Sequence, residues 1–278
     1  MNAQISTIGT NNSGGYSSAM GYNTTASGHY STAMGYFTVA SGTSSTAMGR
    51  GTIASGDDST ALGDETTASG DYSTALGVQT NASGGGSTAM GFYTTASGAL
   101  STAMGSFTIA SDRSSLVLGQ YNSVGSTVTA SATEYSLDNT AFVIGNGLSW
   151  DNRGDALVVK FNGDATLAGN LNINSDARLK ANIVSLGSTL SKLLQIDGKS
   201  YTMKKDESEK QKIGLLAQDI EKVFPELVSE SNGIKSVNYQ GLVPVLINAL
   251  KEQEEKIKSQ EGKLLRLESL VQDLIDNQ

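Results

Sequence analysis

The stretch STAMGYFTVASGTS, residues 31–44, decides the fold of the first part of the chain, because similar stretches follow one another every 14 residues. In each of them a glycine follows Met or Leu, and these glycines are Gly21, Gly35, Gly49, Gly63, Gly77, Gly91, Gly105 and Gly119. Fourteen residues suffice for two short strands and two tight turns, but not for a pair of helices. One such coil cannot bury its own apolar face, whereas stacked coils can. The repeat therefore predicts a stack of parallel coils that grows by roughly 4.8 Å per coil.

The order of residues within the repeat predicts which side chains share a face. In the S-T-A-M part, Thr and Met fall on one face of a strand and Ser and Ala on the other. The glycines are expected where a turn needs a positive φ or where two backbones approach closely.

The variable positions of the repeat are expected at the tips of the turns. Several of them are aromatic, namely Tyr22, Tyr36, Phe37, Phe92, Tyr93 and Phe107. Exposed aromatic residues could form a surface that binds a receptor or a glycan. Alternatively, they are turn residues without a selected role or are buried between subunits. We favour this alternative over a binding surface. The single histidine, His29, is expected to be an exposed turn residue of the same kind.

The 14-residue period is lost after residue 125, and residues 126–174 predict a β-rich neck. This neck would begin with Thr127–Thr129. Short strands are expected at residues 141–145, 156–161 and 165–169, with hairpin turns at Asn146-Gly147 and Asn162-Gly163. Arg153-Gly154-Asp155 spells an integrin-binding tripeptide, but we interpret it as a turn between two strands.

Composition and charge exclude several classes of function. The chain has 278 residues, no cysteine, one histidine and a formal net charge of −8. Disulfides, thiolate metal sites and a cysteine nucleophile are therefore excluded, and we expect no metal and no cofactor. No basic run marks a surface for nucleic acid. The opening MNAQISTIGT is not a signal peptide and no apolar stretch is long enough to span a membrane, so we expect synthesis in the cytoplasm and no membrane insertion.

The composition changes sharply near residue 175, where glycine becomes sparse. Three motifs follow in order: SDARLK at residues 175–180, IGLLAQDIEKVFPELV at residues 213–228, and SVNY at residues 236–239. In the second motif the apolar residues at positions 216, 220 and 223 predict one face of a helix that ends before Pro225.

The last segment has a heptad pattern. Val243, Leu250, Ile257, Leu264 and Val271 occupy one seam position, and Leu246, Gln253, Gln260, Leu267 and Leu274 the position three residues later. This pattern predicts a coiled coil in which the two glutamines set register or oligomeric state at a cost in stability. The alternative is one amphipathic helix lying on a globular domain. Gly262 weakens the helix locally.

These patterns resemble two known families. The 14-residue repeat, over roughly residues 6–125, resembles the head of trimeric autotransporter adhesins, which implies a left-handed parallel β-roll that assembles as a trimer. Similar repeats occur in phage and viral fibre proteins. The three later motifs, together with LVPVLINALKEQ at residues 242–253, resemble the endosialidase-type intramolecular chaperone, also called the S74 peptidase family.

The second resemblance implies self-cleavage between Asn174 and Ser175, with Ser175 as the nucleophile and Lys180 as its general base. A serine hydroxyl is a weak nucleophile until a nearby base accepts its proton. A lysine can do so only in its neutral form, which requires burial or cationic neighbours. Arg178 could supply such a positive field or be an ordinary salt-bridge partner. The role of Asp176, as a cap, an orienting group or a stabilising group, is open.

The sequence thus predicts four segments: a mainly β part with β-roll repeats (1–125), the neck (126–174), an α+β chaperone and autoprotease domain (175–241) and a trimeric coiled-coil helix (242–278). The leading interpretation is a homotrimeric phage or viral tail fibre, a virion protein that meets a host-surface receptor or glycan. Its chaperone would drive trimerisation and then remove itself. The predicted trimer seam consists of Leu250, Ile257, Leu264, Leu267, Val271 and Leu274.

Three alternatives remain. One is a fragment of an adhesin at the surface of a bacterial cell, and another is a trimerisation domain that no longer cleaves. The third is an enzyme acting on polysaccharide, which needs paired carboxylates in a groove. The acidic pairs Asp57-Asp58 and Asp64-Glu65 are expected at turn tips of a narrow roll, which disfavours such an enzyme.

Overall fold

The computed structural model describes residues 7–124, 132–204 and 209–277. The chain forms two compact units, Met1–Ile173 and Asn174–Gln278, and each is described by itself. The strand start that the sequence predicts at Thr127–Thr129 lies outside the described residues. The division into four segments remains a prediction.

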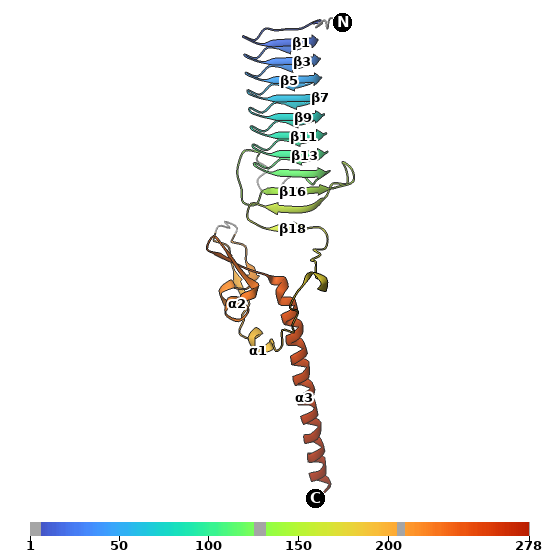
Figure 1. Ribbon diagram of the computed structural model, residues 1–278, viewed down its shortest axis with the longest axis vertical. Coiled ribbons are helices and arrows are strands. Elements are labelled where there is room, and N and C mark those ends of the chain that lie inside the picture. Colours follow the sequence, from blue (N-terminus) through green and yellow to red (C-terminus); the bar gives the residue numbers. More distant parts are fainter. Residues whose placement is uncertain (1–6, 125–131, 205–208, 278) are drawn as a thin grey trace. The chain divides into compact units, whose positions relative to one another are not determined.

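The first unit begins with a parallel β-solenoid, in which long strands stack into one sheet and two-residue strands into a second (Figure 1). The long strands are β1 (Ser18–Tyr22), β3 (Thr32–Tyr36), β5 (Thr46–Arg50), β7 (Thr60–Asp64), β9 (Thr74–Val78), β11 (Thr88–Phe92), β13 (Thr102–Ser106) and β15 (Leu116–Gln120). The short strands are β2 (Thr25–Ala26), β4 (Val39–Ala40), β6 (Ile53–Ala54), β8 (Thr67–Ala68), β10 (Asn81–Ala82), β12 (Thr95–Ala96) and β14 (Ile109–Ala110). Met34 pairs with Met48, so residues 14 apart in the sequence lie opposite each other on neighbouring strands. The predicted stack of parallel coils is confirmed.

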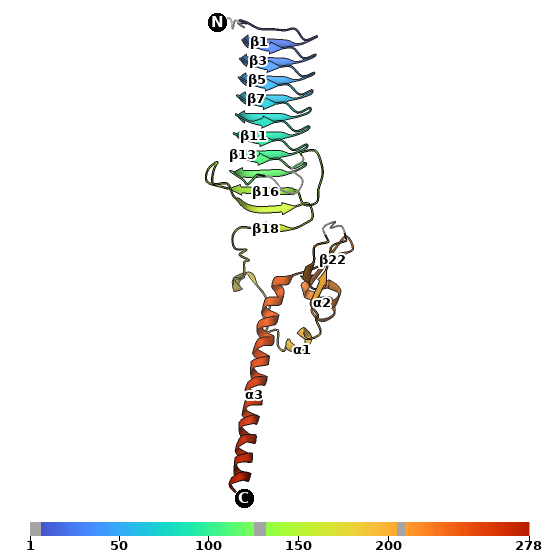
Figure 2. The ribbon, with the colours of Figure 1, turned by 180° about the vertical axis from the view of Figure 1, so that it is seen from behind.

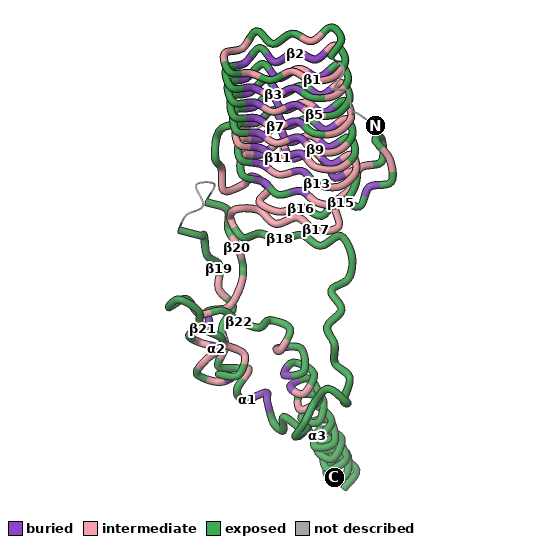
Figure 3. The backbone as a smooth tube through the Cα atoms, turned by 45° about the horizontal axis from the view of Figure 1, so that its top comes forward, coloured by how far each residue is buried: buried purple, intermediate pink, exposed green. Residues whose placement is uncertain are grey.

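Small side chains fill the interior of the solenoid. Ala33, Ala40, Ser31 and Thr38 are buried, whereas Met34 lies on the outer face. Figure 3 shows the buried residues as stripes that repeat from coil to coil. The predicted alternation of faces is confirmed, with Ser and Ala inside. A coil of this size has no room for large apolar side chains, so an interior of Ala, Ser and Thr is the packing that it allows.

The glycines of the repeat are required mainly by close backbone approach. A Cβ atom on Gly35 would lie 2.0 Å from the carbonyl oxygen of Gly49, and Gly35 also has a φ of +131°. The sequence predicts these glycines either at turns or at close backbone contacts. Gly35 lies inside strand β3 rather than at a turn, so the expectation of a turn is wrong for this glycine. The left-handed turn positions are taken by other residues, such as Phe37 with a φ of 55° and Ser44 with a φ of 54°.

The sequence repeat changes at Asp112, which stands where earlier repeats have a glycine. Asp112 is buried, and its Oδ2 atom accepts hydrogen bonds from the backbone N–H (2.8 Å) and the hydroxyl (2.5 Å) of Thr140. Thr140 is the first residue of β16 (Thr140–Asn146), which pairs in parallel with β15. The carboxylate therefore fixes the point at which the chain returns to the sheet.

The short-strand sheet ends on a side chain. The Oδ1 atom of Asn122 accepts a hydrogen bond from the backbone N–H of Ile109 (2.7 Å), and its Nδ2 donates to the carbonyl of Ile109 (2.9 Å). Asn122 is fully buried. Its amide therefore takes the place that the backbone of a further strand would have, and it satisfies the edge of β14.

The long-strand sheet continues into two antiparallel strands, β17 (Asp155–Lys160) and β18 (Ala165–Leu167). The strands that the sequence predicts in this region are present. The predicted tight turn at Asn146-Gly147 is wrong, because the connection between β16 and β17 runs over residues 147–154. Its two ends are held together by a hydrogen bond from the N–H of Asn146 to the carbonyl of Gly154 (3.0 Å).

The second unit has short strands and helices on one long helix. Its elements are η1 (Ala177–Leu179), α1 (Leu190–Leu193), β19 (Lys199–Tyr201), β20 (Lys212–Gly214), α2 (Ala217–Val223), η2 (Pro225–Leu227), β21 (Val228–Ser231), β22 (Ile234–Val237), η3 (Tyr239–Gly241) and α3 (Leu242–Asp276). Its core forms around Ile220, Phe224 and Val245. The predicted helix before Pro225 is confirmed as α2. No helix in the described part of the chain is long and apolar enough to cross a membrane.

Candidate functional site

The structure brings the predicted nucleophile and base into contact. The side chain of Asp176 caps the short helix η1 by accepting a hydrogen bond from the N–H of Arg178 (2.9 Å). This single turn returns the chain, and the Nζ atom of Lys180 then donates a hydrogen bond to the Oγ atom of Ser175 at 2.7 Å. A nucleophile and a base within hydrogen-bond distance are the geometry that proton transfer needs. The catalytic roles themselves remain predictions.

Arg178 forms an ion pair with Asp176 instead of facing the lysine. Its Nε lies 3.0 and 3.1 Å from the two carboxylate oxygens of Asp176, and its Nη2 lies 2.6 Å from Oδ2. The hydrogen bonds from the Arg178 side chain, and then from its backbone N–H, hold the pKa of Asp176 below its ordinary value. The same side-chain pair raises the pKa of Arg178. Of the two roles predicted for Arg178, the geometry favours the salt bridge, because the carboxylate balances its charge.

The site lies in the open on a single chain. Ser175, Lys180 and the preceding Asn174 are all exposed, as is every residue from 175 to 188. Lysine loses its proton readily only where burial or a neighbouring cation disfavours its charge. The pair therefore has the contact that catalysis requires but lacks, on one chain, the enclosure that would activate it.

The segment that carries the site is attached to α3 by a glutamate that the sequence did not reveal. Glu252 accepts hydrogen bonds from the hydroxyl of Ser188 (2.6 Å) and from the backbone N–H groups of Thr189 and Leu190. The hydrogen bond from Ser188 is the largest cause of a lowered pKa of Glu252. The hydroxyl of Thr189 also donates to the carbonyl of Val245 (2.9 Å). No local pattern could have predicted a contact between residues so far apart in the sequence.

The predicted trimer seam lies on the exposed surface of α3. Only Leu242, Val245 and Ala249 of this helix are buried, and these lie in its first turns. The seam residues are exposed by 40% at Ile257 to 68% at Leu250. The alternative in which the whole helix lies on a globular domain of its own chain is therefore wrong for most of its length.

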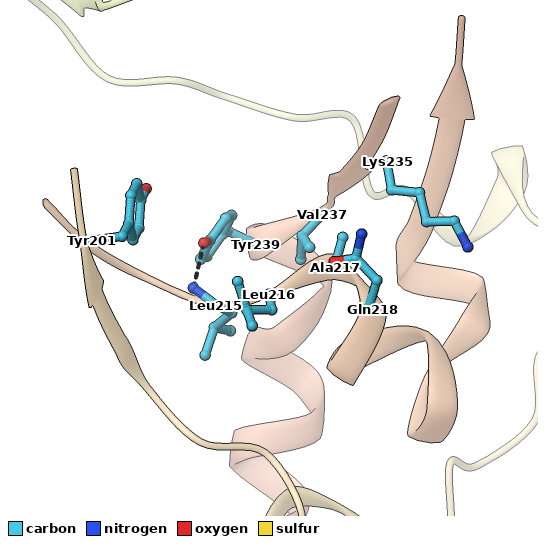
Figure 4. Close-up of a pocket in the computed structure, with 8 residues that line it drawn as sticks. All are labelled: Tyr201, Leu215, Leu216, Ala217, Gln218, Lys235, Val237 and Tyr239. Atoms are coloured by element: carbon cyan, nitrogen blue, oxygen red, sulfur yellow. Dashed lines mark hydrogen bonds between the residues drawn. The ribbon is translucent and has the colours of Figure 1, made fainter. Parts of the chain in front are cut away.

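A hollow of about 340 Å³ lies elsewhere in the second unit (Figure 4). Its lining residues are Tyr201, Leu215, Leu216, Ala217, Gln218, Lys235, Val237 and Tyr239. The hydroxyl of Tyr239 accepts a hydrogen bond from the N–H of Leu215 (2.9 Å). Lys235 is paired with Glu221. None of the predicted site residues lies in this hollow.

The tripeptide Arg153-Gly154-Asp155 is part of the fold of the first unit. The Nη1 atom of Arg153 donates to the carbonyls of Phe107 (3.0 Å) and Asn122 (3.1 Å). The Oδ1 atom of Asp155 accepts the N–H of Ser123 at 2.9 Å. Both charged side chains thus have structural partners, in agreement with the interpretation of this stretch as a turn.

The aromatic residues expected at turn tips form ladders, and three of them, Tyr22, Tyr36 and Phe92, are in fact the last residues of strands β1, β3 and β11. Tyr22 stacks on Tyr36, and Tyr93 stacks on Phe107, which in turn stacks on Tyr121, with ring planes within 13° of parallel. His29 is exposed, as predicted, and contacts the rings of Tyr16 and Tyr30. In a stack of this kind the rings cover one another's faces, which stabilises the register of neighbouring coils.

The acidic residues Asp57 and Asp64 each bond to a residue of the preceding coil. Asp64 forms an ion pair with Arg50 at 2.7 Å, and the Oδ1 atom of Asp57 accepts the N–H of Thr43 (2.7 Å). Within the described ranges, no group of three or more metal-ligating side chains comes together.

A parallel β-solenoid of 14-residue coils, followed by an α+β unit with a long C-terminal helix, is the class that this fold defines. Comparison with known families agrees. Residues 175–229 match the family described as the chaperone of endosialidase. The YadA head domain repeat matches residues 13–38, 40–66, 68–94 and 96–122. Both resemblances drawn from the sequence are confirmed.

The similar curated proteins are long tail fiber proteins named Gp37. The protein of Salmonella phage S16 is 29% identical over 125 residues, or 41% of this chain. That of Enterobacteria phage K3 is 29% identical over 155 residues, or 51% of the chain. That of Enterobacteria phage T2 is 31% identical over 106 residues, or 35% of the chain. The matches span only 17%, 12% and 8% of the length of these three relatives.

Proposed function

We propose that this chain is a homotrimeric fibre protein of the phage tail-fibre type, with a C-terminal chaperone that drives trimerisation and then cleaves itself off at Asn174/Ser175. The observation that carries the proposal is the exposed heptad seam of α3. A helix that leaves such a row of leucine, isoleucine and valine in water is stable when further copies cover the row. The similarity to long tail fiber proteins supports the fibre class.

The solenoid offers a second surface for copies of the chain. Met34, Met48, Leu62 and their equivalents form a continuous apolar row on the outer face of the long-strand sheet. Met34 is 38% exposed and Leu62 is 42% exposed. A long exposed apolar row is typical of a protein interface. In a parallel trimer the equivalent coils of three chains would lie at the same height, and their rows could pack together.

The proposed cleavage uses Ser175 and Lys180. Neutral Lys180 accepts the proton of the Ser175 hydroxyl while Oγ attacks the carbonyl carbon of Asn174. As the amide C–N bond breaks, the protonated lysine returns this proton to the nitrogen of Ser175, and the carbonyl of Asn174 is left as an ester on Ser175 Oγ. Water then hydrolyses the ester, which leaves a carboxylate on Asn174, a free hydroxyl on Ser175 and Ser175 as a new N-terminus. Because Ser175 and Lys180 are exposed on a single chain, we infer that neighbouring chains enclose the pair in the trimer.

This arrangement would couple cleavage to assembly. Three tethered chains have a high effective concentration, which favours registration of the repeated coils. Removal of the helix after assembly would take away the element through which the trimer could dissociate, so the product would be kinetically stable. The mature part would be a virion fibre that meets a receptor or glycan on the host surface. The bacterial adhesin fragment and the non-cleaving trimerisation domain remain the alternatives.

Intact mass and light scattering on freshly expressed protein test the proposal, with a Ser175→Ala variant beside the wild type. We expect a trimeric wild type that is cut between Asn174 and Ser175 and a trimeric variant that stays whole. A Lys180→Met variant should also stay whole, whereas Lys192→Met, at another exposed lysine, should cleave. Uncut trimers of all variants would leave the non-cleaving trimerisation domain, and monomers would refute the fibre proposal.

A further inference from the structure

The connection between β16 and β17, residues 147–154, extends past the strand ends of the solenoid in both ribbon views (Figures 1 and 2). Its backbone is closed on itself. The N–H of Leu148 donates to the carbonyl of Asn152 (2.8 Å), and the N–H of Asn152 donates to the carbonyl of Ser149 (3.2 Å). The loop therefore has one defined shape, although it lies outside the sheet.

The base of this loop is fixed to the last coils. The N–H of Gly154 donates to the carbonyl of Tyr121 (3.0 Å), and the Nε2 of Gln120 donates to the carbonyl of Gly147 (3.0 Å). Arg153 lies with its guanidinium over the ring of Tyr121, at 5.9 Å from the ring centroid. A loop that is already ordered loses little conformational freedom when it binds a partner.

The rigid loop presents two large apolar side chains to solvent. Trp150 is 75% exposed and Leu148 is 76% exposed. The stacked rings of the solenoid have faces that other rings cover, but within the described part of the chain no ring contact involves Trp150. Tyr72 is similarly open, at 71%, but it lies in an ordinary turn of the repeat. Trp150 is thus an open aromatic face on a preorganised support.

The side chains beside Trp150 are polar. Ser149, Asp151 and Asn152 offer a hydroxyl, a carboxylate and an amide, and the Ser149 hydroxyl holds the Asp151 carboxylate by a hydrogen bond of 2.5 Å. The electron-rich face of an indole attracts the C–H edges of a pyranose ring. Carboxylate and amide groups next to it can bind the sugar hydroxyls. We propose that this loop is a binding site for a neutral glycan, with Trp150 stacked on a sugar ring.

The charges of the loop indicate that the glycan is neutral. Arg153 is the one cation between residues 147 and 155 in the sequence, and its guanidinium is engaged by two backbone carbonyls. Asp151 and Asp155 add negative charge. An acidic glycan would meet carboxylates here without a free cation to balance its own charge.

This inference rests on the proposed function, since it names a partner for the proposed fibre. Strands β16, β17 and β18 are the last strands before Asn174 in the sequence. Cleavage at Asn174/Ser175 would therefore leave this loop among the last ordered elements of the remaining chain. A rigid loop with an exposed tryptophan in that place is suited to contact a host surface.

The test uses an array of neutral, amino-substituted and anionic glycans, probed with the full chain in wild-type and Ser175→Ala form. Trp150 is the single tryptophan, so its fluorescence reports on this loop alone. We expect neutral glycans to bind, to shift the emission to shorter wavelength, and to bind about tenfold or more weakly to a Trp150→Ala variant. Trp150→Phe should retain part of the affinity, and Tyr72→Ala should bind like the wild type.

Three results would overturn the inference. They are no binding to any neutral glycan, binding that survives Trp150→Ala, and tryptophan emission that is already shielded from acrylamide in the free protein because another copy covers the loop. Mass and light scattering on the same samples report separately on cleavage and trimerisation. A failure of the proposed function is thus visible apart from a failure of this site.

Discussion

Replacing single glycines by alanine should separate two reasons why the solenoid needs them. A Cβ atom on Gly77 would lie 2.0 Å from the carbonyl oxygen of Gly91, which is shorter than a normal contact between these two atoms by 1.0 Å or more. The φ of Gly77 is +127°. On Gly70 the Cβ would lie 2.2 Å from the oxygen of Gly84, but its φ is not in the left-handed range. On Gly163 the φ is +89° and nothing lies within 4 Å.

These three positions carry different costs. A positive φ costs an alanine about 1–3 kcal/mol, which is the whole effect expected for Gly163→Ala. Overpacking against a neighbouring backbone costs about 1–3 kcal/mol or more, which is expected for Gly70→Ala. Gly77→Ala combines both and should cost about 4 kcal/mol or more. We expect Gly77→Ala to lose the most thermal stability and the other two variants to lose less, each for one of the two reasons.

Circular dichroism at the β-sheet wavelength during heating measures these losses, with each variant made in the uncleaved Ser175→Ala chain so that the covalent state is the same. The reasoning is refuted if Gly70→Ala unfolds at the wild-type temperature. The spacing of the coils would then tolerate a methyl group between them, and close backbone approach would not be the reason for this glycine.

Three further variants test other parts of the structure. Asn122→Ala leaves the N–H and carbonyl of Ile109 at the sheet edge without their side-chain partner, and should cost about 1–3 kcal/mol in denaturant unfolding. Thr66→Val replaces a buried hydroxyl for which the structure shows no hydrogen-bond partner, and should be neutral or stabilise by up to about 2 kcal/mol; a large loss of stability would contradict this. The pKa of Glu252 is lowered by its hydrogen bond from Ser188, so the stability it adds is present above the ordinary glutamate pKa and is lost as the pH falls through the lower, folded value. The protection of the α1 amides, measured relative to the intrinsic exchange rate at each pH, should therefore fall at acid pH in the wild type, and a Glu252→Gln variant should show the lower protection at neutral pH as well.

Much of the first unit could be predicted because its contacts repeat at a fixed distance along the chain. Met34 pairs with Met48 as the 14-residue period requires, and the faces of each strand follow from simple alternation. The pairing of Ser175 with Lys180 was expected only from the family resemblance, and one short turn brings the two side chains into contact. These features depend on neighbours that the sequence itself places close together.

The features that were missed depend on where distant segments meet. The sequence predicted a two-residue turn at Asn146-Gly147, but the hydrogen bond between Gly154 and Tyr121 carries the chain into a longer loop. The integrin-like tripeptide was interpreted as a turn without any indication that Arg153 and Asp155 hold the end of the solenoid. Nothing near Glu252 in the sequence indicated that it holds α1.

The sequence by itself determined the period, the strand register, the small-residue interior and the heptad row of α3. Each of these follows from backbone geometry and side-chain size acting over a few residues, and the repeat multiplies that local signal. Only the tertiary structure decided how the solenoid ends, on the Asn122 amide and the Asp112 carboxylate. It also decided that Arg178 pairs with Asp176 and that Trp150 lies open on a rigid loop. These outcomes depend on hydrogen bonds and packing between particular segments that no local pattern specifies.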